Sequence, residues 1–218
     1  MQNSTSLSLP RLYPILDAGL LRARGMDAAV FAASLRAAGI EWLQYRNKQG
    51  EEAEVVREAA AIREVFASAP VRLILNDYAG LLARTGFDGV HVGQGDMAPA
   101  AARKQIGAQA ILGLSTHSVE QALAAVDTDC DYIACGPVFA TASKQNPDPV
   151  IGLDGVRAIR RVTRKPLVAI GGITRANCRS VLEAGANSVA VISDLLPAPG
   201  SRDATQKIAE EFLALLRA

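Results

Sequence analysis

The feature that most constrains the fold is an alternation of short apolar runs with longer amphipathic stretches along almost the whole chain. Eight runs rich in β-forming residues begin at Leu12, Glu41, Val71, Asp88, Ala110, Asp131, Pro166 and Asn187. Between them, apolar residues recur every three or four positions in stretches such as 28–38, 51–66, 153–162 and 177–184, and a final stretch spans 205–216. Strands that alternate with helices predict βα units around a parallel sheet.

The number of units selects the architecture. Eight strand–helix units make a (β/α)₈ TIM barrel, and 218 residues lie near the lower end of the size range of that fold. An open doubly wound sheet is the alternative, but no glycine-rich dinucleotide motif follows the first strand. We therefore expect a single TIM-barrel domain over residues 11–218, preceded by an N-terminal tail of residues 1–10.

Composition narrows the class of partner. The formal net charge is +1 and no long run of Lys or Arg occurs, so the sequence lacks the basic surface typical of nucleic-acid or membrane binding. No stretch approaches the roughly 20 apolar residues of a membrane-spanning helix, and the first residues do not resemble a signal peptide. These observations predict a cytoplasmic protein that acts on small molecules, and they leave open a homo-oligomer.

The cysteines and histidines give little functional signal. Cys130, Cys135 and Cys178 are odd in number and lack C-x-x-C spacing, so we predict reduced, buried thiols. His91 alternates with valines in a strand and His117 follows a strand end. We predict structural roles for both in preference to a catalytic base.

Active sites of barrels of this kind lie at the carboxyl ends of the strands. The second predicted strand ends in Gln44, Arg46 and Lys48, where a period of two directs Gln44 and Arg46 to the same side. A planar guanidinium and a compact ammonium suit a diphosphate. A solvated charge cluster after a strand has the same pattern, so that alternative stays open here.

Carboxylates follow the next two strands. Asn76 and Asp77 end the third strand, and Asp96 follows the fourth. Magnesium takes one or two protein carboxylates and completes its octahedron with water and phosphate oxygens, so Asp77 and Asp96 suffice for a metal that arrives with a diphosphate. The alternative is that both aspartates are helix N-caps.

A further group of hydroxyl and amine side chains follows the fifth and sixth strands. Ser115 ends the fifth strand, and residues 136–152, with three prolines, form a longer connection than most βα loops. This connection is a candidate lid that carries Thr141, Ser143 and Lys144. These three residues suit a phosphate, although a solvated loop has the same composition.

The last two strands end in a pattern typical of phosphate sites. Gly171 and Gly172 follow the seventh strand, and Ile192 and Ser193 follow the eighth. Barrels commonly bind phosphate at these two strand ends, through glycine amides and the N-terminus of a helix. A glycine pair that serves only as a tight turn is the alternative.

Taken in order, these motifs resemble the thiamine phosphate synthase family. The matching segments are QYRNK (44–48), LNDY (75–78), GVHVGQGD (89–96), LGLSTHS (112–118), GPVFATASK (136–144), AIGGIT (169–174) and VAVIS (189–193). The resemblance covers nearly the whole chain apart from the N-terminal tail. It departs at Tyr45, where the family often has a smaller apolar residue, and at Asn47 and Gly95, where it often has an acid.

The resemblance implies a Mg²⁺-dependent transferase that joins an aminopyrimidine diphosphate to a thiazole phosphate and releases diphosphate. The pyrimidine diphosphate would be bound by Gln44, Arg46, Lys48, Asn76, Ser115 and Lys144. Of these, the catalytic group would comprise Arg46, Lys48, Ser115 and Lys144. The metal would be bound by Asp77 and Asp96, and the thiazole phosphate by Thr141, Ser143, Gly172, Ile192 and Ser193. A thiazole tautomerase paralogue and a non-catalytic phosphate-sensing barrel are alternatives, which the presence of both halves of the site disfavours.

Overall fold

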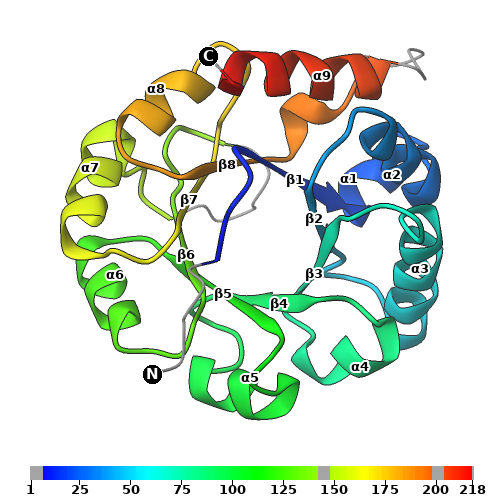
Figure 1. The fold of residues 1–218 in the computed structure, drawn as a ribbon, viewed down its shortest axis with the longest axis horizontal. Coiled ribbons are helices and arrows are strands. Elements are labelled where there is room, and N and C mark those ends of the chain that lie inside the picture. The colour runs from blue at the N-terminus through cyan, green and yellow to red at the C-terminus, as the bar shows by residue number, and fades with distance from the viewer. Residues whose placement is uncertain (1–6, 142–147, 198–203, 218) are drawn as a thin grey trace.

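Eight parallel strands form a closed barrel in the order of the chain (Figure 1). The computed structural model describes residues 7–141, 148–197 and 204–217. The strands are β1 (Leu12–Asp17), β2 (Trp42–Arg46), β3 (Arg72–Asn76), β4 (Gly89–Val92), β5 (Ile111–Thr116), β6 (Tyr132–Cys135), β7 (Leu167–Ile170) and β8 (Ser188–Val191). The predicted TIM barrel is confirmed. The open sheet is wrong, because β8 pairs with β1 and places Ala190 opposite Tyr13.

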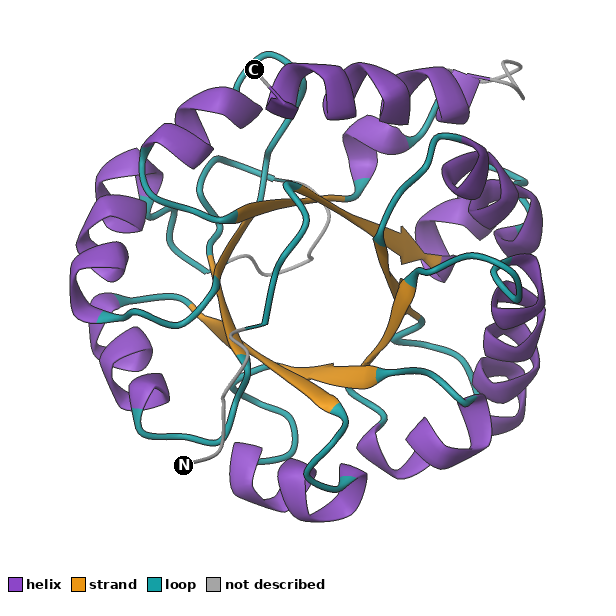
Figure 2. Ribbon diagram, in the orientation of Figure 1, coloured by secondary structure: helices purple, strands orange, loops and turns teal. Residues whose placement is uncertain are grey.

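The helices surround the barrel and cover its outer face (Figure 2). They are α1 (Ala18–Ala23), α2 (Ala28–Ala37), α3 (Glu52–Val65), α4 (Leu82–Thr85), α5 (Pro99–Ile106), α6 (Val119–Val126), α7 (Gly152–Val162), α8 (Cys178–Glu183) and α9 (Ala204–Arg217), with 3₁₀ turns η1 (Ala79–Leu81) and η2 (Ser193–Leu195). The five helices expected from periodicity begin and end within one residue of the predicted bounds. None of the helices in the described residues has the length and apolarity to span a membrane.

Several helices begin at a local sequence signal. The side chain of Asp17 accepts a hydrogen bond from the Leu20 amide at the start of α1, and Asp27 does the same for two amides of α2. Ser118 caps α6 through the amide of Gln121. Each cap satisfies an N–H group that has no partner within its helix, so the strand-to-helix turns are defined locally.

The core has two layers, because alternate residues of each strand face opposite sides of the sheet. On β1, Leu12 and Leu16 pack outward against the helices, whereas Tyr13 and Ile15 face the barrel interior. Burial on both faces explains why the strands are nearly continuous apolar runs. The inward-facing residues continue to the carboxyl ends of the strands, where the polar residues lie.

Aromatic side chains fill the amino end of the barrel interior. Tyr13, Trp42 and Tyr132 contact one another edge to face, with ring centroids 5.6 to 6.1 Å apart. Leu7 and Leu9, from the segment expected to be a tail, pack against this cluster, and Figure 1 shows that segment crossing the barrel opening. The remaining interior space therefore lies at the carboxyl end.

Candidate active site

A cavity of about 430 Å³ opens at the carboxyl ends of the strands. All eight strands contribute to its lining, and its volume is typical of a small-molecule site. The predicted site residues that line it are Gln44, Arg46, Lys48, Asn76, Asp77, Asp96, Ser115, Thr141, Gly172, Ile192 and Ser193. The other two predicted residues, Ser143 and Lys144, and the central part of the candidate lid lie outside the described residues.

At one end of the cavity, two carboxylates converge on a single cation. The Lys48 Nζ atom lies 2.5 Å from Asp77 Oδ2 and 3.5 Å from Asp96 Oδ1. The N-cap alternative is wrong for both aspartates, since η1 follows Tyr78 and α5 follows Ala98, neither with a side-chain cap. Asp77 instead adopts a left-handed conformation with φ of 68°, which aspartate tolerates better than most residues.

The two carboxylates titrate as a pair. Burial, reinforced by a hydrogen bond with Asp96, raises the pKa of Asp77 to about 6, although Lys48 opposes the shift. Partial burial also acts to raise the pKa of Asp96, but its bonds to Asp77, the Gly93 amide and Lys48 outweigh burial and lower it. As the pH falls toward 6, the pair therefore takes up its first proton on Asp77.

Arg46 is fixed by an acid that the sequence analysis did not single out. The Arg46 guanidinium forms an ion pair with Asp17, whose side chain is only 7% exposed. Asp17 also caps α1 by accepting from the Leu20 amide. One carboxylate therefore contacts both the first turn of α1 and the Arg46 guanidinium. The sequence did contain a signal for Asp17, because it is an acid at the carboxyl end of β1. The other candidate residues were identified at the same position on their strands.

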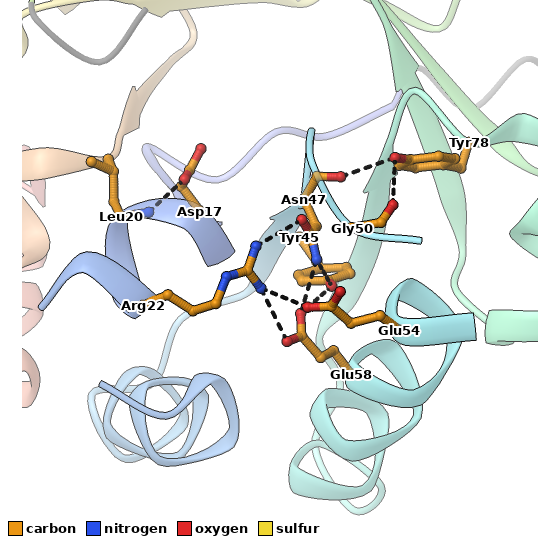
Figure 3. A network of polar contacts seen from close by, with 9 residues as sticks. All are labelled: Asp17, Leu20, Arg22, Tyr45, Asn47, Gly50, Glu54, Glu58 and Tyr78. Carbon is orange, nitrogen blue, oxygen red and sulfur yellow. Dashed lines mark hydrogen bonds and ion pairs between the residues drawn. The ribbon is translucent and has the colours of Figure 1, made fainter. Parts of the chain in front are cut away.

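A polar network outside the barrel supports the loop that carries Lys48 (Figure 3). The Asn47 side chain is 2% exposed and donates to Glu58 and to the Tyr45 hydroxyl. Its Oδ1 atom accepts from Arg22 at 3.1 Å. The Tyr45 hydroxyl donates to Glu58 as well.

This network includes a direct contact between Tyr45 and Asn47. Tyr45 supplies a hydroxyl, and Asn47 supplies an amide that contacts it. The Tyr78 hydroxyl also donates to the carbonyl oxygens of Asn47 and Gly50, so side chains hold the backbone on both sides of Lys48.

The opposite end of the cavity contains the glycine pair, in conformations that need glycine. Gly171 and Gly172 have φ of 101° and 62°, and a Cβ atom on Gly172 would lie 2.5 Å from the Ala140 carbonyl oxygen. Asn177 secures the turn by accepting from the Thr174 amide and donating to the Gly172 carbonyl oxygen. The pair thus allows the loop after β6 to approach the loop after β7 closely.

The loops after β7 and β8 are joined by an ion network. Asp194, next to Ser193 in η2, accepts from the Arg175 amide at 3.0 Å and from Arg175 Nε at 3.2 Å. Arg175 also pairs with Glu211 of α9 at 2.5 Å. The two strand ends predicted to bind phosphate therefore form one connected unit.

Both histidines line the cavity, whereas none of the three cysteines does. His117 Nδ1 lies 2.7 Å from the Gly136 carbonyl oxygen, and its Nε2 lies 3.4 Å from Asp148, so it links both ends of the long loop after β6. His91 is 7% exposed within the barrel. The three cysteines are buried and free, as predicted.

A family model described as thiamine monophosphate synthase matches residues 12–195. The chain belongs to the thiamine monophosphate synthase family. It is 50% identical to the thiamine-phosphate synthase of Koribacter versatilis over 98% of this chain and 99% of that one. It is 44% identical to the synthase of Chloroflexus aurantiacus over 86% of each chain.

Solved structures agree with this family membership. The thiamine phosphate pyrophosphorylase of Pyrococcus furiosus is 28% identical and superposes with a TM-score of 0.81, covering 95% of this chain and 96% of that one. A tryptophan synthase of Mycobacterium tuberculosis, 16% identical with a TM-score of 0.70 over 95% and 93% of the two chains, shares the fold alone.

Proposed function

We infer that the chain is a thiamine-phosphate synthase, a transferase of thiamine biosynthesis. It moves an aminopyrimidinylmethyl group from its diphosphate to the nitrogen of a thiazole phosphate, or of the carboxylated tautomer, and releases diphosphate. The observation that carries this conclusion is one cavity with two chemically different ends. Lys48, Asp77 and Asp96 lie at one end, and the Gly172 and Ser193 loops lie at the other.

The residues at the first end suit Mg²⁺. Asp77 and Asp96 already converge on the Lys48 ammonium, and both offer the oxygen ligands that magnesium prefers. The described residues contain no group of three or more metal-ligating side chains, so water and diphosphate oxygens would complete the coordination. Bound there, Mg²⁺ would neutralise negative charge on the leaving diphosphate.

The cationic side chains at this end serve the leaving group. Arg46 and Lys48 line the cavity from β2 and its loop, and a preorganised positive charge stabilises the charge that develops on a leaving diphosphate. Asp17 holds the guanidinium before substrate arrives. Asn76 also lines this end, and Lys144 belongs to the same proposed set.

No protein nucleophile is needed for this reaction. The electron-rich aminopyrimidine stabilises a cationic methylene after diphosphate departs, and the thiazole nitrogen attacks with its own electron pair. Ser115 lies 2.8 Å from His91, and the second nitrogen of that histidine contacts the Tyr132 hydroxyl. The Ser115 hydroxyl therefore suits substrate binding better than the triad chemistry of acyl transfer.

The thiazole phosphate is assigned to the glycine end of the cavity. Gly172, Ile192 and Ser193 line it together with Thr141, and Ser143 belongs to the same proposed set. Holding both substrates in one cavity converts a bimolecular encounter into a local one.

The test is a coupled assay with both phosphorylated substrates, with and without Mg²⁺. We expect thiamine phosphate and diphosphate to appear in equal amounts and only with the metal. Isomerisation of the thiazole phosphate without either product would instead identify a tautomerase. Binding of thiazole phosphate without any conversion would identify a sensing protein.

A further inference from the structure

A chain of hydrogen bonds crosses the barrel interior, and all of its residues except Tyr132 line the cavity. Ser115 Oγ lies 2.8 Å from His91 Nε2, and His91 Nδ1 lies 2.9 Å from the Tyr132 hydroxyl. That hydroxyl lies 3.1 Å from the hydroxyl of Tyr13, which accepts from Gln44 Nε2 at 3.2 Å. The chain thus joins β5 to β2, and the residues at its two ends both line the cavity.

The orientation of the Gln44 amide, whose Nε2 faces the Tyr13 hydroxyl, gives this chain one direction. Because Tyr13 accepts from Gln44, its own proton goes to Tyr132. The Tyr132 proton then goes to His91 Nδ1, so the imidazole proton resides on Nε2 and is donated to Ser115. The Gln44 carbonyl oxygen remains available as an acceptor in the cavity, and Ser115 keeps its hydroxyl proton.

The surroundings are built to hold this arrangement. Gly113 of β5 lies opposite His91 and Tyr132 on the neighbouring strands, and a Cβ atom there would lie 2.1 Å from the Tyr132 ring and 2.4 Å from His91 Nδ1. Trp42 packs edge-on against both Tyr13 and Tyr132. Complete burial raises the pKa of both phenols, so each remains a proton donor at neutral pH.

We propose that Tyr13, Tyr132 and His91 are positioning residues that make Gln44 an acceptor and Ser115 a donor in the cavity. This inference rests on the proposed function. An aminopyrimidine offers the matching groups, an amino N–H donor and a ring nitrogen acceptor. Its 4-oxo counterpart offers a carbonyl acceptor and a ring N–H donor, which is the reverse pattern.

The hydrogen-bond chain therefore selects the amino form of the pyrimidine. A site built to hydrogen-bond a substrate strongly rejects an analogue that leaves its buried polar groups unpaired. Reversal of the chain would make Gln44 a donor and Ser115 an acceptor, and it would invert the preference. Selectivity thus depends on the tautomer of His91.

The first test measures that tautomer by ¹⁵N NMR in the protein without substrates. The chain has two histidines, so the His117→Asn variant assigns the signals. We expect the His91 imidazole to be neutral with its proton on Nε2, and we expect Tyr132→Phe to abolish this single tautomer. A proton on Nδ1, or on both nitrogens at the pH of the assay, would overturn the proposal.

The second test measures dissociation constants for the aminopyrimidine diphosphate and its 4-oxo counterpart, with Mg²⁺ and without thiazole phosphate. We expect Tyr132→Phe to reduce the preference for the amino form about tenfold. Tyr45→Phe is the matched control, because it removes another buried phenol hydroxyl, one that contacts Glu58 outside the barrel. The control should leave the preference unchanged.

An equal loss of preference in both variants, or none in Tyr132→Phe, would overturn the proposal. Circular dichroism establishes that each variant is folded. The synthase function and the role of His91 are tested separately. A wild-type protein that forms no thiamine phosphate contradicts the synthase function, whereas NMR determines the His91 tautomer without any substrate.

Discussion

The ammonium group of Lys48 lies 2.5 Å from a carboxylate oxygen of Asp77. The lysine comes from the loop after β2 and the aspartate from the end of β3, so neighbouring βα units bring opposite charges together at the cavity. The contact lies where the diphosphate and metal are proposed to bind, and it leads to the first two predictions.

Asp77→Asn should reduce kcat/KM by at least about 100-fold, because it removes one of the two carboxylates proposed to bind the metal. It should not reduce stability. The raised pKa means that folding disfavours the ionised carboxylate, so removing the charge should leave the melting temperature unchanged or higher at pH values above the pKa. Steady-state kinetics and thermal unfolding measure the two effects.

Asp88→Asn is the matched control. Asp88 pairs with Arg72 and accepts from the Leu73 amide before β4, at the other end of the barrel. Loss of this carboxylate should leave kcat/KM unchanged. Equal losses of activity in the two variants would contradict the assignment of a metal site to Asp77.

The apparent affinity for Mg²⁺ should fall as the pH drops through about 6, because Asp77 then gains a proton that the metal must displace. The same shift makes the folded protein bind a proton more tightly than the unfolded chain does. The stability contribution of Asp77 is therefore present below the usual carboxyl pKa and declines as the pH rises toward 6. Magnesium titrations between about pH 5 and about pH 8 test this, and a flat profile would contradict it.

Asp17→Asn should raise the KM for the pyrimidine diphosphate about tenfold with a smaller change in kcat, because Arg46 loses its ion-pair partner. The amide oxygen can still cap α1. Asp17→Ala should show the same kinetic effect and in addition lose about 1 kcal/mol of unfolding free energy through the missing cap. Unchanged KM values in both variants would show that Arg46 is held by other contacts.

Asn47→Asp should lower the free energy of unfolding by about 2 kcal/mol, because it places a second carboxylate beside half-buried Glu58 and removes the amide donor. Combining it with Glu58→Gln should recover most of the loss, since only one charge then remains. Denaturant unfolding of both single variants and the double variant measures this coupling. Additive losses would contradict a direct interaction.

Gly172→Ala should abolish detectable binding of thiazole phosphate, because its Cβ atom would displace the Ala140 carbonyl in the adjoining loop. Gly107→Ala is the control. Gly107 also has a positive φ, 82°, but follows α5 and has open space around its Cβ position. Both variants should show the cost of strained backbone, about 1 kcal/mol, and only Gly172→Ala should lose the ligand. Calorimetric titration distinguishes them.

The sequence alone was sufficient for the arrangement of elements along the chain. Helix bounds such as those of α3 and α9 follow from apolar residues three and four positions apart, and strands such as β2 follow from short β-forming runs. Those patterns depend on residues that are close together in the sequence, so they predict helices and strands without knowledge of the tertiary structure. Because barrel active sites lie at the carboxyl ends of the strands, the sequence also predicted that Gln44, Asp77 and Ser115 lie at one cavity.

The partners of those residues depend on closure of the barrel. Asp17 meets Arg46 across 29 positions, and Tyr13 meets Tyr132 across 119; no local pattern encodes either contact. The sequence equally allowed Asp77 and Asp96 to be helix caps. Packing of all eight units around one axis brought the aspartates to a common cation and aligned the interior hydroxyls in one chain, because only closure determines which inward-facing side chains share the same space.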